Sequence, residues 1–143
     1  MAIDFDFGLK QRKVTMSALD EFARLSGKLF VGGKYISSTT TAHLDVIEPA
    51  TEDRLGQIAD ATDSEVDQAI DVASLARRKW LSMDARSRAV VLHDIAAVIR
   101  RDKSQFAEFL TREEGKPFKE SVDEVSWCAT AIDYYAELAR HET

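Results

Sequence analysis

The chain has 143 residues, of which 45% are hydrophobic and 31% charged, and its formal net charge is −6. This length and composition fit one domain with a modest core. The acidity opposes binding to a phosphate backbone, so we expect no nucleic-acid partner. Because no apolar run approaches the roughly 20 residues that span a bilayer and the N-terminus is acidic, we expect no membrane contact and predict a cytoplasmic protein.

Residues 1–28 are interpreted as an N-terminal extension that contains a short helix. Leu19, Phe22 and Leu25 recur at helical spacing and share one face. Gly27 suits the end of such a helix, because glycine adopts the left-handed conformation without strain.

The next third of the chain is predicted to be a small antiparallel β element. Residues 29–36 contain a central Gly-Gly pair, which permits the positive φ angles of a tight hairpin turn. Residues 44–47 and 55–59 are further strand candidates, and residues 48–53 between them are rich in turn-forming residues.

Three amphipathic helices are predicted after the strands. Thr62 and Glu65 form a capping box at the start of the first helix. Asp84 caps the second, whose apolar stripe continues past Asp102 to Leu110, so we expect one long helix there. The stripe of the first helix is Val66, Ala69, Ile70, Ala73, Ala76 and Trp80, and that of the third is Val122, Val125, Ala129, Ile132, Ala136 and Ala139.

A helix stop and restart is predicted between the second and third helices. Gly115 suits the left-handed position after a helix end, and Lys116 lies where a cation favours the terminal carbonyls. Pro117 fits the first turn of the following helix, which needs no amide donor there.

These pieces together, in order from about residue 29 to about residue 139, resemble the N-terminal part of the NAD(P)-dependent aldehyde dehydrogenase family. The resemblance implies an α/β parent fold, in which residues 29–143 form an α+β piece of the cofactor-binding domain, cut before the dinucleotide sheet. The matching segments are residues 29–34, 48–51, 65–69, 80, 84–88 and 111–117.

The resemblance implies an enzyme that oxidises an aldehyde to a carboxylate with NAD or NADP as a homo-oligomer. In that family the cofactor-contacting segments, the nucleophilic cysteine and the general-base glutamate lie downstream of the matched region. Since residue 143 falls in or just after a helix, we expect a truncated, non-catalytic scaffold with no catalytic or cofactor-binding residue and no bound cofactor.

Several residues imitate functional motifs without their companions. Cys128 lies in the middle of the third helix beside its apolar stripe, so we expect a packed or partly buried structural thiol rather than a nucleophile. The tripeptide at residues 6–8 matches the magnesium-binding motif of protein kinases, but no other kinase motif accompanies it. The histidines lack a second ligand at metal spacing, which opposes a zinc site; they are His43, His93 and His141.

One candidate site follows from the resemblance, because many family members bind a structural monovalent cation. The corresponding ligands here are the backbone carbonyls of Val46 and Ile47 and the carboxylate of Glu113. Glutamate stands where the family more often has aspartate, and the ion would not take part in catalysis. The other carboxylates are expected to face water.

A second hypothesis of function comes from a different class. Helical spacing alone also fits a free-standing protein-interaction module, in which the apolar seam of the third helix binds a partner and no reaction is catalysed.

Overall fold

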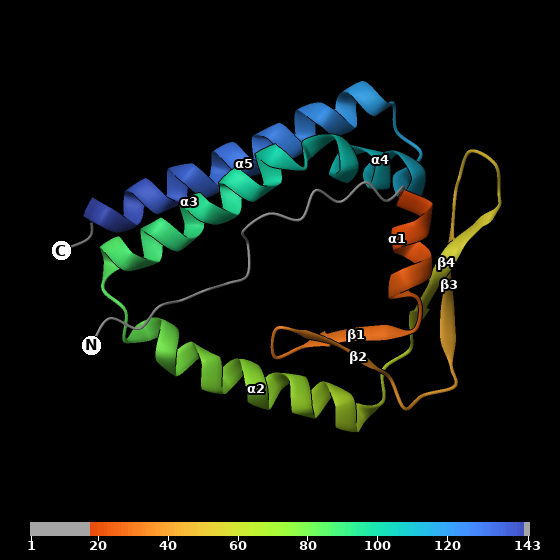
Figure 1. The fold of residues 1–143 in the computed structure, drawn as a ribbon, viewed down its shortest axis with the longest axis horizontal. Coiled ribbons are helices and arrows are strands. Elements are labelled where there is room, and N and C mark those ends of the chain that lie inside the picture. Colours follow the sequence, from red (N-terminus) through yellow and green to blue (C-terminus); the bar gives the residue numbers. More distant parts are fainter. Residues whose placement is uncertain (1–17, 142–143) are drawn as a thin grey trace.

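The computed structural model describes residues 18–141 (Figure 1). The acidic N-terminus and the kinase-like tripeptide at residues 6–8 lie outside the described residues. Helix α1 comes first, followed by four strands and then by helices α2 to α5. The bounds are α1 Ala18–Leu25, β1 Lys28–Val31, β2 Lys34–Ser37, β3 His43–Ile47, β4 Arg54–Ala59, α2 Asp63–Leu81, α3 Ala85–Arg101, α4 Lys103–Glu114 and α5 Phe118–His141.

The four strands form two separate antiparallel ribbons rather than one β element. In the first ribbon, Val31 pairs with Lys34, so Gly32 and Gly33 make a two-residue turn. Their φ angles of 60° and 77° confirm the predicted hairpin with two left-handed residues. The second ribbon pairs β3 with β4 and confirms both predicted strands.

The best-buried part of the described structure lies where α3 and α5 run side by side (Figure 1). Ala89 and Ala96 on α3, and Ala129 and Ala136 on α5, have no exposed surface. Small side chains at the contact let two helix backbones approach closely, because little volume separates them. The predicted seam of the third helix is therefore the packing face of α5.

The prediction of one long second helix is wrong, because the chain forms two helices there, α3 and α4. Asp102 ends α3 and begins α4, with φ −102° and ψ 18°, outside the helical region. Its carboxylate accepts hydrogen bonds from the Arg101 guanidinium. The break redirects the chain, and four helices instead of three follow the strands.

Helix α1 packs against two later elements. The rings of Phe22 and Phe109 on α4 meet edge to face, with centroids 5.0 Å apart. Gly56 on β4 lies beneath Phe22, because a Cβ at that glycine would be 3.5 Å from the Phe22 Cβ. Gly27 has φ 67° after the helix end, as expected. The part of α1 that carries Phe22 is therefore packed against the rest of the structure. The proposed boundary at residue 28, between the N-terminal extension and the family region, stays a prediction.

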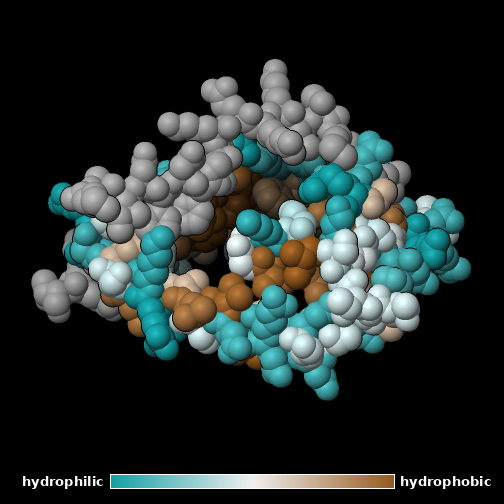
Figure 2. All heavy atoms as spheres, turned by 60° about the horizontal axis from the view of Figure 1, so that its bottom comes forward, coloured by the Kyte–Doolittle hydropathy of each residue, from teal (hydrophilic) through white to brown (hydrophobic). Residues whose placement is uncertain are grey.

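Helix α2 is held mainly at its first turn. The predicted capping box is present: Thr62 Oγ1 accepts from the Glu65 amide, and the Glu65 carboxylate accepts from the Thr62 amide at 2.9 Å. Its apolar stripe is mostly exposed, as at Val66 and Ile70. Figure 2 shows hydrophobic atoms uncovered on the face that this helix borders.

Among residues 18–141, no helix combines the length and the apolar character that a membrane crossing requires.

Candidate functional site

The candidate site lies where the β3–β4 turn meets the end of α4. Gly115 ends α4 with φ 78°, and its amide donates to the Thr111 carbonyl at 2.9 Å. This confirms the predicted left-handed helix stop. The turn is closed by two hydrogen bonds, from the Glu48 amide to the Asp53 carbonyl at 2.9 Å and from the Glu52 amide to the Glu48 carbonyl at 2.8 Å.

Two sequence motifs that lie far apart in the chain meet at this point. A Cβ on Gly115 would lie 3.2 Å from the Cβ of Pro49, so the absence of a side chain permits the approach. Arg112 Nη1 lies 3.4 Å from Glu48 Oε2, which adds an ion pair across the same contact. The turn motif and the helix-stop motif therefore form one junction.

The residues of the predicted cation site lie on the two sides of this junction. Val46 and Ile47 end β3 immediately before Glu48, and the pairing register shifts between them. A register shift locally disrupts the ladder of hydrogen bonds. Glu113 is exposed on the last turn of α4, and among the described residues its carboxylate has no hydrogen bond or ion pair. The donor set of two carbonyls and a free carboxylate suits a hard cation.

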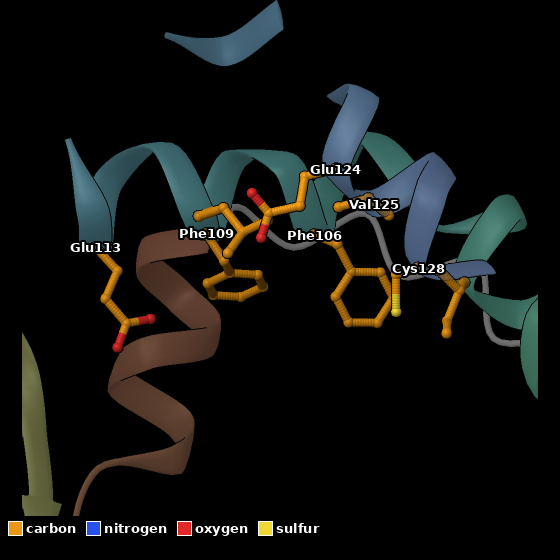
Figure 3. Close-up of a pocket in the computed structure, with 8 residues that line it drawn as sticks. Phe106, Phe109, Glu113, Glu124, Val125 and Cys128 are labelled. Atoms are coloured by element: carbon orange, nitrogen blue, oxygen red, sulfur yellow. The ribbon is translucent and has the colours of Figure 1, made fainter. Parts of the chain in front are cut away.

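An apolar pocket of about 380 Å³ adjoins the junction and lies between α3, α4 and α5. Figure 3 shows Glu113 at one end, directed away from the phenylalanine rings, and Cys128 at the other. The lining residues are Ile99, Phe106, Phe109, Leu110, Glu113, Glu124, Val125 and Cys128.

The prediction that the Cys128 thiol is packed or partly buried is wrong, because Cys128 is exposed. Its neighbour Ala129 points into the α3–α5 contact and has no exposed surface, whereas Cys128 lies at the edge of the packing face. There it lines the open pocket together with Phe106, which is itself 42% exposed. Helical spacing placed Cys128 near the seam but could not show which elements cover that edge.

The charged residues around the junction are mostly paired. Lys116 binds Glu114 at 2.9 Å and also contacts Glu124 on α5. Hydrogen bonds to the Glu124 and Glu114 carboxylates raise the pKa of Lys116 above its ordinary value. Lys116 thus ties the start of α5 to the end of α4, a role that its position in the sequence did not reveal.

The histidines take different positions. His43 is exposed at the start of β3, and the side chain of His141 is not among those described. His93 lies between Asp133 and Glu137, two partners that sequence spacing did not show. No group of three or more histidine, cysteine, aspartate or glutamate side chains within residues 18–141 is arranged to hold a metal ion.

The sequence matches the aldehyde dehydrogenase family over residues 35–143. The chain belongs to this family. The match includes both motifs of the junction and all the helices from α2 to α5, so it covers most of the structure described above.

Solved aldehyde dehydrogenases share the fold. Lactaldehyde dehydrogenase from Escherichia coli is 31% identical, with a TM-score of 0.78 over 82% of this chain. A 3,6-anhydro-L-galactose dehydrogenase solved in complex with NADP is 35% identical, with a TM-score of 0.75 over 80%. Betaine aldehyde dehydrogenase from Staphylococcus aureus, solved with NAD⁺, is 23% identical, with a TM-score of 0.80 over 87%.

The chain spans about a quarter of the length of these solved structures, covering 24%, 24% and 25% of them respectively. Short strands followed by several helices confirm the predicted α+β piece of an aldehyde dehydrogenase-like fold.

Proposed function

We propose that this chain is the N-terminal part of an NAD(P)-dependent aldehyde dehydrogenase and serves as a non-catalytic scaffold within it. The family match over residues 35–143, combined with coverage of only 24% of lactaldehyde dehydrogenase, supports the proposal. The reaction of the longer protein would oxidise an aldehyde to a carboxylate and reduce NAD or NADP. When bound, the nicotinamide cofactor would act as the hydride acceptor. The cysteine nucleophile and the general base would belong to other parts of that protein.

The contacts among the described residues support the proposed scaffold role. The α3–α5 packing and the Pro49–Gly115 contact fix the relative positions of helices and turns. Neither arrangement includes a nucleophile paired with a base. Such a rigid element positions the groups that other segments contribute.

The cation site is part of the proposal. Val46, Ile47 and Glu113 would bind a monovalent cation that stabilises the junction without entering the reaction. Thermal unfolding in potassium or sodium chloride, compared with the larger tetramethylammonium ion at equal ionic strength, tests this. We expect the smaller ions to raise the melting temperature of the wild type and to lose this effect in Glu113→Gln. An equal response in the Glu113→Gln variant, or no ion preference in the wild type, would contradict the site.

We also propose a cytoplasmic homo-oligomer. Large aromatic side chains on α5 are uncovered in the described structure, with Trp127 79%, Tyr134 61% and Tyr135 64% exposed. Apolar surface of this kind is commonly buried at interfaces. Sedimentation across micromolar concentrations should show association of the isolated chain, whereas a compact monomer without exposed-surface dye binding would favour the interaction module of the second hypothesis.

The main test compares two proteins. The isolated 143-residue chain should show no aldehyde-dependent absorbance of reduced nicotinamide, whereas a longer product of the same coding sequence should show it. Removing residues 1–143 from that longer product should abolish the activity if the scaffold is required. Reduction of NAD(P) by the purified short chain would overturn the scaffold assignment, and an inactive longer product would overturn the dehydrogenase assignment.

A further inference from the structure

A line of alternating charges crosses the contact between α3 and α5. His93 on α3 is central: Nδ1 lies 2.7 Å from Asp133 Oδ1, and Nε2 lies 2.7 Å from Glu137 Oε1. Behind these carboxylates stand two permanent cations. Arg100 Nη2 is 2.5 Å from Asp133 Oδ2, and Arg140 Nη1 is 3.4 Å from Glu137 Oε1. The order is therefore cation, carboxylate, imidazole, carboxylate, cation.

The geometry favours a doubly protonated imidazole. A neutral histidine carries one N–H, so it donates to one carboxylate and presents a lone pair to the other. Across a distance of 2.7 Å, that lone pair would face an ionised oxygen without a proton between them. The imidazolium ion donates from both nitrogens and satisfies both contacts.

The surroundings favour the same state. Hydrogen bonds with Asp133 and then Glu137 raise the pKa of His93 above its ordinary value of 6.5 and outweigh partial burial. In turn, hydrogen bonds from His93 and Arg100 lower the pKa of the Asp133 carboxyl. The two carboxylates lie on opposite ring nitrogens, so they do not converge on a common metal ion.

We propose that His93 is a protonation-dependent clamp between α3 and α5, closed when the imidazole carries both protons and weakened when it loses one. This inference goes beyond the proposed dehydrogenase function, and it concerns none of the residues that form the junction. The two helices also share the buried alanine contact, so the clamp adjusts an existing interface instead of creating it.

The direction of the pH effect follows from the raised pKa. The stabilisation by His93 is fully present below about pH 6.5, the ordinary value of the group, and is lost as pH rises through the higher value of the folded state. The other charged groups that face the imidazole or its partners are Asp133, Glu137, Arg100 and Arg140, and carboxyl and guanidinium groups ordinarily have pKa values outside this range. The change therefore comes from the imidazole proton.

Nuclear magnetic resonance titration of the imidazole signals in the full chain tests the clamp. We expect His93 to titrate above pH 6.5 and to carry protons on both nitrogens below its midpoint. Asp133→Asn and Glu137→Gln should each lower its midpoint. Glu124→Gln serves as the matched control, because Glu124 lies on the same helix but contacts Lys116. His43→Gln and His141→Gln identify the His93 signal by elimination, so the assignment does not depend on a variant within the clamp.

A second measurement follows the interface itself. The melting temperature of the wild type should exceed that of His93→Gln at pH 6, and the difference should shrink as pH rises. A His93 midpoint at or below 6.5, or a midpoint unaffected by both carboxylate variants, would overturn the clamp. A constant difference in melting temperature would overturn it as well, because packing alone does not depend on the proton.

Discussion

The α3–α5 pair and the α2 arm are held by different interactions. Between α3 and α5, alanines such as Ala96 and Ala129 have no exposed surface, and the two helices run side by side. Helix α2 is held mainly at its first turn, where Glu65 accepts from the Thr39 amide at 2.7 Å and from the Thr62 amide. Beyond that turn, Ile70 and Leu75 are 57% and 63% exposed.

This difference shows that packing and capping have separate roles. Close packing of small residues is sensitive to volume, because neighbouring backbones leave no space. A cap is sensitive to its hydrogen-bonding groups and tolerates changes of volume further along the helix. Changes in the two regions should therefore differ in kind as well as in size.

The largest effect is expected from Ala129→Leu. The added atoms would enter the α3–α5 contact and lower the free energy of unfolding by about 1–3 kcal/mol. Ala131→Leu is the matched control, because Ala131 is exposed on the same helix and the change should stay within about 0.5 kcal/mol. Urea unfolding measures both, and equal effects would contradict the close packing.

Gly115→Ala should have the next largest effect. The left-handed backbone at φ 78° costs about 1–2 kcal/mol for alanine, and the new Cβ would press on Pro49. Gly33→Ala provides a comparison, because φ is 77° there and no atom lies within 4 Å of the added Cβ. Thermal unfolding should show a greater loss of stability for Gly115→Ala than for Gly33→Ala. The difference between the two losses measures the contact of residue 115 with Pro49. A smaller loss than for Gly33→Ala would contradict that contact.

Glu65→Gln should act locally, on α2 and the segment before it. Hydrogen bonds from Thr39 and Thr62 lower the pKa of Glu65 to about 2. Its contribution is therefore present above pH 4.5, the ordinary value, and is lost as pH falls towards 2. Hydrogen exchange should show faster exchange of the Thr39 and Thr62 amides in the variant.

The exposed Asp67→Asn on the same helix is the control for this change. The α3–α5 amides should keep their protection in both variants. Loss of protection across α5 in Glu65→Gln would show that the two regions unfold together and would break the comparison.

The smallest effect is expected in thiol labelling of Cys128, where unfolding should change the labelling rate little. The thiol is exposed, so labelling should proceed at comparable rates in the native and the denatured chain. The measurement is unambiguous because the chain has one cysteine. Strong protection in the native state would show that the pocket beside α5 is covered in solution.

Much of the fold could be predicted from local patterns. The capping box at Thr62, the cap at Asp84, the Gly-Gly hairpin and the left-handed Gly115 were all predicted and are confirmed. Each depends on atoms within a few residues of one another, so the sequence contains the whole interaction. The break at Asp102 was missed because the apolar stripe continues across it.

The candidate site was predictable in its parts but not in its assembly. The motifs at residues 48–51 and 111–117 were recognised separately, whereas the Pro49–Gly115 contact and the Arg112–Glu48 ion pair appear only in three dimensions. The cation site remains a prediction. The partners of His93 were missed because 40 and 44 residues separate them from it.

The sequence by itself determined the helix caps, the tight turn, the amphipathic faces and the family resemblance, because these depend on residue type and short spacing. The tertiary structure decided where α3 ends, which edge of α5 exposes Cys128, and which carboxylates surround His93. Those outcomes depend on how distant segments pack, since a helical pattern specifies a face but not the element that covers it.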